Sequence, residues 1–143
     1  MRLTVYSDFS LRLLMYAALR PGELVTIQQV ADAYGISRNH LMKVAFELGR
    51  HGFLETVRGR GGGLRLARPP HQIGLGEVVR KTEDDFNLVE CFADANSGCV
   101  LTSRCRLKGA LSRALSAYLA VLDEYTLADL TKNRAELAGL LPA

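Results

Sequence analysis

Several classes of protein are excluded by what this chain of 143 residues lacks. It has no tryptophan, and no apolar run approaches the ~20 residues that a bilayer-spanning helix needs. Charged residues interrupt the stretch 1–22, which also has no small-residue cleavage site, so we do not expect a signal peptide. These absences favour a cytoplasmic protein with no membrane partner, in a compartment where thiols stay reduced.

The arrangements that enzymatic catalysis usually needs are also absent. His40, His51 and His71 are all distant from the cysteines in sequence, and there is no paired-carboxylate or Ser/His/Asp pattern. The glycine-rich stretch 58–63 does not have the GxxxxGK[ST] spacing of a phosphate-binding loop. We therefore expect that the protein is not an enzyme. The alternative, an enzyme with a cysteine nucleophile, would lack a general base.

Charge is distributed unevenly along the chain, although the net charge is only +3. Residues 1–81 hold 12 Lys and Arg against 6 Asp and Glu, whereas residues 82–143 hold 6 against 9. A basic first half joined to an acidic second half favours a nucleic-acid-binding face on the first. An ordinary solvated charged surface is the alternative that charge alone leaves open.

The basic half begins with two predicted helices. Ser7 is expected to cap the first, which runs to about Arg20 and ends at a Pro-Gly pair. Thr26 opens a capping box, Thr26-Ile-Gln-Gln29, before a second helix over 27–34. Gly35 suits the left-handed position that commonly ends a helix, so the chain is expected to turn sharply there.

A third predicted helix follows the turn, with Ser37 as its cap and an end near His51. Two short helices joined by a tight glycine-containing turn are typical of a helix-turn-helix motif, whose second helix enters the major groove of double-stranded DNA. Polar side chains suited to base edges and phosphates gather on these elements. The candidate DNA-binding residues here are Thr26, Gln28, Ser37, Arg38, Asn39, His40 and Lys43.

A β-hairpin is predicted directly after the recognition helix. Residues 53–57 and 64–67 have the character of strands, and the loop between them is rich in glycine. Such a hairpin is the wing of a winged helix, whose glycine-rich tip can approach a narrow groove where Arg58 and Arg60 suit the negative potential. Arg65 is a further candidate for phosphate or minor-groove contact. A plain flexible hairpin is the alternative.

All three cysteines of the chain, Cys91, Cys99 and Cys105, fall within 15 residues. A cluster of thiolates selects zinc, Cu(I) or an iron–sulfur cofactor, and an odd number of cysteines argues against a structural disulfide. The spacing C-x7-C-x5-C is looser than a ferredoxin pattern. Structural zinc, buried thiols acting as small apolar residues, and a thiol redox switch are therefore left open.

A long helix with an apolar stripe is predicted from Arg106 onward. Such a stripe must be buried, either on its own domain or, as we favour, against a second copy in a homodimer that reads two half-sites. A short helix is expected to begin at Thr126, followed by a weakly ordered tail. The stripe is formed by Leu107, Leu111, Leu115, Tyr118, Leu122 and Tyr125.

Together these elements predict a mainly α fold with a small β-hairpin: a winged helix-turn-helix domain plus a long dimerisation helix. We expect a DNA-binding domain over 1–82, a cysteine-bearing loop that binds a cluster over 83–105, and the dimerisation helix and tail over 106–143.

Stretches along nearly the whole chain resemble the Rrf2 family of winged-helix regulators. They include LTVYSDFSLRLLMY at the start, YGISRNHLMKV at the recognition helix and VRGRGGGLRLARP at the wing. The resemblance continues through LGEVVR, the three cysteines with CRLKGAL, and DEYTLADL. The combination of CRLK with YTLADL is similar to the nitric-oxide-sensing branch of the family.

The resemblance implies a transcriptional repressor of nitric oxide detoxification genes, with nitric oxide as its signal. It implies an iron–sulfur cluster held by Cys91, Cys99 and Cys105 in a homodimer, most simply 4Fe-4S, with 2Fe-2S as the alternative. The functional alternative is a regulator of the same fold that senses iron or cluster status, or oxidants, through the cluster or a thiol switch.

Three thiolates leave one position of a 4Fe-4S cluster open. Our hypothesis for the fourth ligand is Asp8, from the same or the partner chain, against the alternative of a carboxylate that only favours the helix N-terminus. The other carboxylates considered are Glu83, Asp84, Asp85, Glu90 and Asp94.

Overall fold

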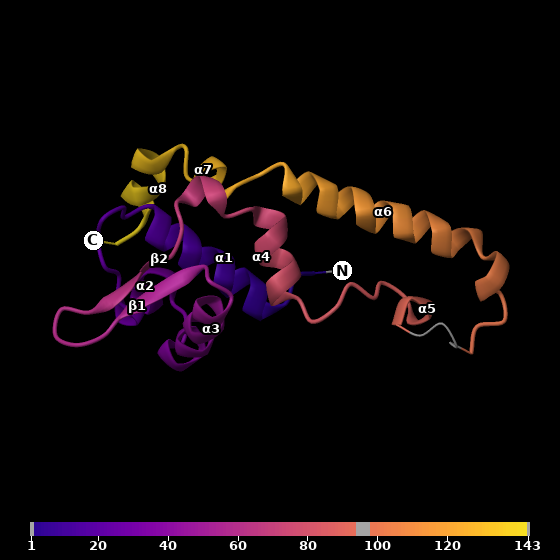
Figure 1. Ribbon diagram of the computed structural model, residues 1–143, viewed down its shortest axis with the longest axis horizontal. Helices are drawn as coiled ribbons and strands as arrows, with labels where there is room; N and C mark the ends of the chain where they lie inside the picture. The colour runs from indigo at the N-terminus through magenta and orange to yellow at the C-terminus, as the bar shows by residue number, and fades with distance from the viewer. Residues whose placement is uncertain (1, 94–97, 143) are drawn as a thin grey trace.

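The computed structural model describes residues 2–93 and 98–142, and it has a helical body from which one long helix projects (Figure 1). The mainly α fold class with one small hairpin is confirmed. No helix in the described ranges is long and apolar enough to cross a membrane. The elements are α1 (Val5–Ala18), α2 (Ile27–Tyr34), α3 (Arg38–Arg50), β1 (Leu54–Val57), β2 (Gly63–Leu66), the 3-10 turn η1 (Pro70–Gln72), α4 (Leu75–Thr82), α5 (Glu90–Ala93), the 3-10 turn η2 (Thr102–Arg104), α6 (Arg106–Asp123), α7 (Leu127–Leu130) and α8 (Arg134–Leu140).

Helix α1 begins earlier than the sequence indicated, because Thr4 and not Ser7 is its N-cap. The Thr4 hydroxyl accepts a hydrogen bond from the backbone N–H of Ser7 at 3.1 Å. Ser7 is instead fully buried and donates its hydroxyl to Thr82 Oγ1 of α4 at 2.8 Å. The predicted Ser7 cap was wrong because Thr4 and Ser7 are both capping residue types, and only tertiary packing decides between them.

The helix-turn-helix forms as predicted. Thr26 and Gln29 make both reciprocal bonds of the capping box at the start of α2. Gly35 has φ 63° and ends α2 in the left-handed region, which costs a residue without Cβ little. Ser37 then caps α3, accepting from His40 N–H at 3.4 Å.

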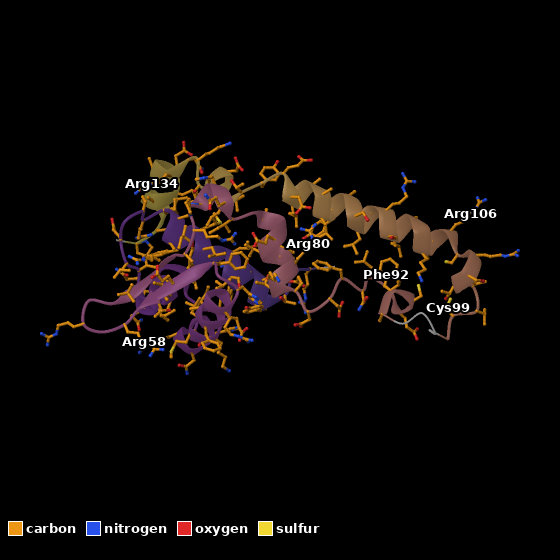
Figure 2. The ribbon with its side chains drawn as sticks, viewed as in Figure 1. Arg58, Arg80, Phe92, Cys99, Arg106 and Arg134 are labelled. Atoms are coloured by element: carbon orange, nitrogen blue, oxygen red, sulfur yellow. The ribbon has the colours of Figure 1, made fainter. Side chains whose placement is uncertain are left out.

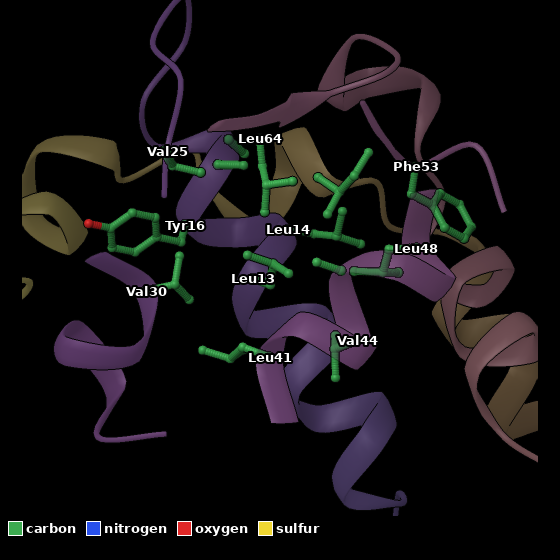
Figure 3. Packing of buried hydrophobic residues seen from close by; sticks show 14 of the residues in the cluster. Leu13, Leu14, Tyr16, Val25, Val30, Leu41, Val44, Leu48, Phe53 and Leu64 are labelled. Carbon is green, nitrogen blue, oxygen red and sulfur yellow. The ribbon is translucent and has the colours of Figure 1, made fainter. Parts of the chain in front are cut away.

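One hydrophobic core joins α1, α2, α3 and the hairpin (Figure 3). Leu41, Val44 and Leu48, each about one helical turn from the next on α3, meet the buried face of α1. Phe53 closes the core between α3 and β1. This core fixes α3 relative to the wing. Its fully buried side chains include Leu13, Leu14, Val30, Leu41, Val44, Leu48 and Phe53.

The hairpin pairs β1 and β2 in antiparallel register, with Leu54 opposite Leu66 and Val57 opposite Gly63. Gly63 lies against the strand-like residue Val25, where an added Cβ would be 2.7 Å from the Val25 carbonyl oxygen. The sequence placed the two strands within a residue of these limits, and the glycine is required by close backbone approach.

Helix α6 leaves the body and buries none of its 18 residues (Figure 1). Its C-terminal end is anchored on α4, where Arg80 and Asp123 form a two-pronged ion pair with Nη2–Oδ2 at 2.7 Å. A Cβ on Gly76 would overlap the Asp123 carboxylate, so this contact also needs a glycine in α4. The ion pair thus holds the C-terminal end of α6 on α4, and farther along the helix Leu115 and Tyr118 face a pocket that Leu3 also lines.

The C-terminal segment returns to the body, so the expected weakly ordered tail was wrong. Leu127 is 3% exposed in the core, and its N–H donates to the Ile73 carbonyl at 2.8 Å. Farther on, Arg134 Nε donates to the Leu19 carbonyl at 3.0 Å, next to α8. Each of these contacts is a single long-range hydrogen bond, and such bonds leave no periodic pattern in the sequence from which they could be predicted. The division into 1–82, 83–105 and 106–143 stays a prediction.

Candidate functional site

The recognition helix presents a basic polar face to solvent. Arg38, Asn39 and Lys43 are exposed, as predicted for residues that contact DNA. His40 is half-buried, and its ring lies edge-on to Phe9 with centroids 4.8 Å apart. The side-chain oxygen of Ser37 serves as the α3 cap, so it is committed to the helix before any DNA arrives.

On α2, the candidate side chains are engaged in local bonds. Thr26 is committed to the capping box. Gln28 donates from Nε2 to Asp32 Oδ1 at 2.8 Å on the exposed face of the helix. Both lie at the N-terminal end of α2, where N–H groups and the helix dipole favour a phosphate. Their predicted role in DNA binding stays a prediction.

The wing carries two kinds of arginine. Arg58 and Arg60 are exposed at the loop, and in the described part of the chain no salt bridge engages either of them. Arg65 is instead paired across the hairpin with Glu55, at 2.9 and 3.2 Å. This pair lowers the pKa of Glu55, through the hydrogen bond first and the charge second. Arg65 would have to leave Glu55 to reach a phosphate.

Cys99 lies near the far end of α6, well away from Arg58 of the wing (Figure 2). Cys91 lines a cavity with Lys108 of α6, and Cys105 directly precedes that helix. Cys91 and Cys105 are half-buried, Cys99 is exposed, and all three are free thiols. Cys105 is also the N-cap of α6: its sulfur accepts the Lys108 N–H at 3.4 Å. A sulfur at a helix N-terminus is in a place that favours negative charge, which suits a thiolate ligand.

A cavity of about 350 Å³ adjoins Cys91, between the loop and α6. Lys108 brings a positive charge to its wall, which would offset part of the charge of a thiolate-bound group. The remaining lining is mixed, with two phenylalanines and a leucine beside Asn87 and Ser112. The cavity is lined by Phe86, Asn87, Cys91, Phe92, Lys108, Ser112 and Leu115.

Three soft thiol donors in one loop, with a helix N-terminus and a lysine beside them, chemically suit an iron–sulfur cluster. Over 2–93 and 98–142, however, no three His, Cys, Asp or Glu side chains are already gathered as a metal site. The described loop therefore supplies the donors without a preformed cage.

Asp8 lies in the first turn of α1, on the body, and pairs with Arg12 at 2.8 Å. It does not join the cysteines of its own chain in a candidate metal site. The hypothesis that Asp8 is the fourth ligand is therefore directed to the partner's cysteines. Of the other carboxylates, Glu83 accepts from Thr4 N–H and Oγ1 at 2.8 and 2.9 Å, and Asp94 lies outside the described residues.

The sequence reasoning missed a buried polar link between α1 and the start of the cysteine loop. Ser7 donates to Thr82, Thr82 donates to the Val78 carbonyl at 2.9 Å, and Thr4 binds the adjoining Glu83. These contacts join the helix that carries Asp8 to the residue from which the loop departs. The signal in the sequence was the presence of hydroxyl side chains at the start of α1 and at the end of α4, but only the fold brings them together.

A basic, exposed recognition helix followed by an arginine-bearing wing defines the class: a winged helix-turn-helix DNA-binding protein. The Rrf2 family model, described as an iron-dependent transcriptional regulator, matches residues 3–133. The HTH-type transcriptional regulator NsrR of Bacillus subtilis is 60% identical, covering 99% of this chain and 97% of that protein. The regulator of the same name from Geobacillus kaustophilus is 51% identical, covering 99% and 97%.

Solved structures show the same fold. The global cysteine regulator CymR of B. subtilis aligns with a TM-score of 0.74 at 22% identity, covering 93% of this chain and 98% of that one. IscR of T. potens aligns with a TM-score of 0.75 at 23% identity, covering 93% and 88%. The chain belongs to the Rrf2 family of transcriptional regulators, and it is a DNA-binding regulator, not an enzyme.

Proposed function

We propose that this protein is a cytoplasmic, homodimeric repressor that senses nitric oxide through an iron–sulfur cluster and controls nitric oxide detoxification genes. The observation that carries the proposal is that Cys105 belongs to the cysteine trio and also caps α6. The same atom thus links a thiolate site to the start of the long helix. High identity to regulators named NsrR, and a family described as iron-dependent, support the same assignment.

Dimerisation through α6 is supported by its exposed apolar residues. Leu107 is 63% exposed and Tyr125, at the other end of the stripe, is 45% exposed, whereas the stripe residues between them are half-buried by their own chain. Burial of such a stripe against its symmetry mate would remove this apolar area from water. Two recognition helices in one dimer would then read an operator with two half-sites, at a spacing that α6 determines.

The residues that would hold the cluster are Cys91, Cys99 and Cys105, with Asp8 of the second chain as the proposed fourth ligand. When bound, the cluster would supply iron that reacts with nitric oxide. Within the protein, tying three thiols to one group would fix the start of α6. An oxygen ligand is a weaker partner for iron than a fourth thiolate, which suits a reactive site.

Asp8 can act as a ligand only if its carboxylate is released from Arg12 or shared with it. The pair is exposed and local, between residues four apart on α1, so its loss costs the fold little. Ligation by Asp8 would connect the cysteine loop of one chain to the DNA-binding body of the other. An Asp8→Ala protein is expected to keep its fold but to change its visible spectrum and its response to nitric oxide.

The proposal is tested by measuring iron and acid-labile sulfide per chain after anaerobic purification, and by following the visible spectrum and operator binding as nitric oxide is added. We expect near-stoichiometric iron and sulfide, a spectrum that collapses on nitric oxide, and loss of operator binding with it. Cys99→Ser is expected to lose the cluster, whereas Ser116→Ala on α6 is the matched control and should keep it.

Other outcomes point to the alternative. A cluster that is stable to nitric oxide but lost on iron starvation or oxidation would assign the same fold to iron or oxidant sensing. Zinc or no metal, with operator binding that responds to thiol oxidants, would indicate a thiol switch. Operator binding that is identical with and without the cluster would contradict control of DNA binding by the cysteine site.

A further inference from the structure

The recognition helix carries two large apolar side chains on its solvent face. Phe46 is 66% exposed and Met42 is 51% exposed, whereas the other apolar face of α3, including Leu41, Val44 and Leu48, is fully buried in the core. The helix is thus apolar on two sides, and only one of them serves the domain's own stability. Exposed large apolar side chains on an otherwise polar face indicate a contact with another molecule.

Helical geometry places Phe46 on the same side of α3 as the DNA-facing residues, one turn farther toward the C-terminal end of the helix. Residues three, four and seven apart share a face of a helix, so Phe46 lies one turn from Met42 and Lys43 and two turns from Asn39. All three of these neighbours are exposed. The acidic residue on this part of α3, Glu47, forms an ion pair with Arg50 at 3.0 Å, which offsets its charge.

The position of α3 distinguishes this surface from the dimer helix. In Figure 1, α3 lies along the lower side of the body and α6 extends from the upper side, with α1 contacting both α3 and α7 between them. Phe46 and Met42 are therefore continuous with the basic recognition surface rather than with the exposed stripe of α6.

We propose that Phe46 and Met42 read the 5-methyl groups of thymine in the major groove. The thymine methyl is the one apolar group that base pairs display in that groove, and aromatic and aliphatic side chains contact it. Asn39, on the same face, is the residue type that pairs with adenine N6 and N7. Adenine pairs with thymine. A helix face that carries both Asn39 and the two apolar side chains therefore suits recognition of A·T base pairs within each half-site.

This inference rests on the DNA-binding function and on α3 as its recognition helix. Its consequence is that specificity comes in part from apolar contacts, which are insensitive to salt. The contacts of Arg38 and Lys43 with phosphates weaken steeply with salt. Loss of the apolar readers should therefore change sequence preference while leaving the salt dependence of binding as it was.

The test begins with the full anaerobically purified chain and a pool of random double-stranded DNA, from which bound duplexes are selected and sequenced. Each thymine of the selected duplex is then replaced, one at a time, by deoxyuridine, which pairs alike but lacks the methyl. We expect at least one position per half-site at which this replacement weakens binding about fourfold, the factor that burial of one methyl-sized group gives. Phe46→Ala or Met42→Ala should bind the thymine duplex several-fold more weakly and show no further loss with deoxyuridine there.

Leu140→Ala is the control variant, since Leu140 is an apolar side chain 82% exposed on α8, away from α3. It should select the same sequence and keep the full deoxyuridine effect. Phe46→Leu should restore part of that effect, because a branched aliphatic side chain can also cover a methyl. Circular dichroism and low-salt binding to random DNA establish that each variant is folded.

The inference is overturned if Phe46→Ala and Met42→Ala both keep the wild-type consensus and the wild-type loss with deoxyuridine. That result would leave the proposed function intact, since the chain would still select an operator. A wild-type chain that enriches no sequence from the pool would overturn the inference and sequence-specific repression together.

Discussion

The winged-helix body and the segment from Glu83 to Asp123 are built on opposite principles. The body buries leucines and valines from α1 to α4, both strands and α7 in one core, and side chains cap the starts of α1, α2 and α3. The other segment contains α5 and α6, in which no residue is buried. A reader of DNA needs a preformed shape, whereas a sensor must change shape when its ligand changes. The difference separates a part with its own hydrophobic core from one that, under the proposed function, a cofactor and a second chain would complete.

The largest expected effect compares a core leucine with a leucine of α6. Leu48→Ala removes a side chain that is fully buried, and it should lower the free energy of unfolding by about 2–5 kcal/mol. Leu107→Ala, at 63% exposure within the chain, should leave the folding of the body unchanged and weaken the dimer. Urea unfolding and sedimentation at several concentrations measure the two. Equal loss of stability would mean that α6 belongs to the fold of the monomer.

A smaller effect is expected for the buried link between α1 and α4. Ser7→Ala leaves the Thr82 hydroxyl without its donor in a buried site, which should cost about 1–3 kcal/mol. The exposed Ser116 of α6 is the matched control, and its alanine variant should unfold as the wild type does. A Ser7→Ala protein of unchanged stability would show that Thr82 finds another partner.

The anchor of α6 should affect DNA binding more than stability. Asp123→Ala removes the exposed ion pair with Arg80, so the thermal midpoint should move little. The direction of α6 would be less constrained, so affinity for a two-half-site operator should fall several-fold while affinity for a single half-site holds. Gly76→Ala, which displaces the same carboxylate, should have a similar effect. Unchanged operator affinity in both variants would show that the anchor of α6 does not set the spacing at which the half-sites are read.

The smallest effect concerns pH and the Glu55–Arg65 pair of the wing. The folded-state pKa of Glu55 is lowered, so its contribution to stability is present above the ordinary glutamate pKa of 4.5 and is lost as pH falls below it. The thermal midpoints of wild type and Glu55→Gln should therefore converge as the pH falls below about that value. A difference that stays constant down to acid pH would mean that the pair does not stabilise the hairpin.

Local rules predicted most of the body. Thr26, Gly35 and Ser37 act as caps and turn because their side chains and backbone preferences decide the matter within a few residues. The same rules failed at Ser7, whose hydroxyl is directed by a helix seventy-five residues away. The pattern at α3 predicted the exposed polar residues of the helix and overlooked the exposed Phe46, because a periodicity argument assigns apolar residues to the core.

The sensor site was predictable only as a set of donors. Three cysteines in a short stretch indicated a cofactor, and nothing in their spacing indicated that Cys105 would also begin a helix. The proposed role of Asp8 would depend on a contact between chains, which no pattern within one chain can specify. Sequence periodicity reports which faces are apolar, and it does not report which molecule covers them.

The path of the chain has a consequence for how this family can diversify. The backbone departs from α4 after Thr82 and comes back at Tyr125 and Thr126, where Leu75 N–H donates to the Tyr125 carbonyl at 2.9 Å and Gly74 pairs with Thr126. Both ends of this segment are thus held at α4 or at Gly74, the residue before it. Everything between is an insertion into a finished domain, comparable to a long loop between two clamped ends. We expect that its length and ligands can be exchanged without refolding the reader, which would let one DNA-binding body acquire many signals.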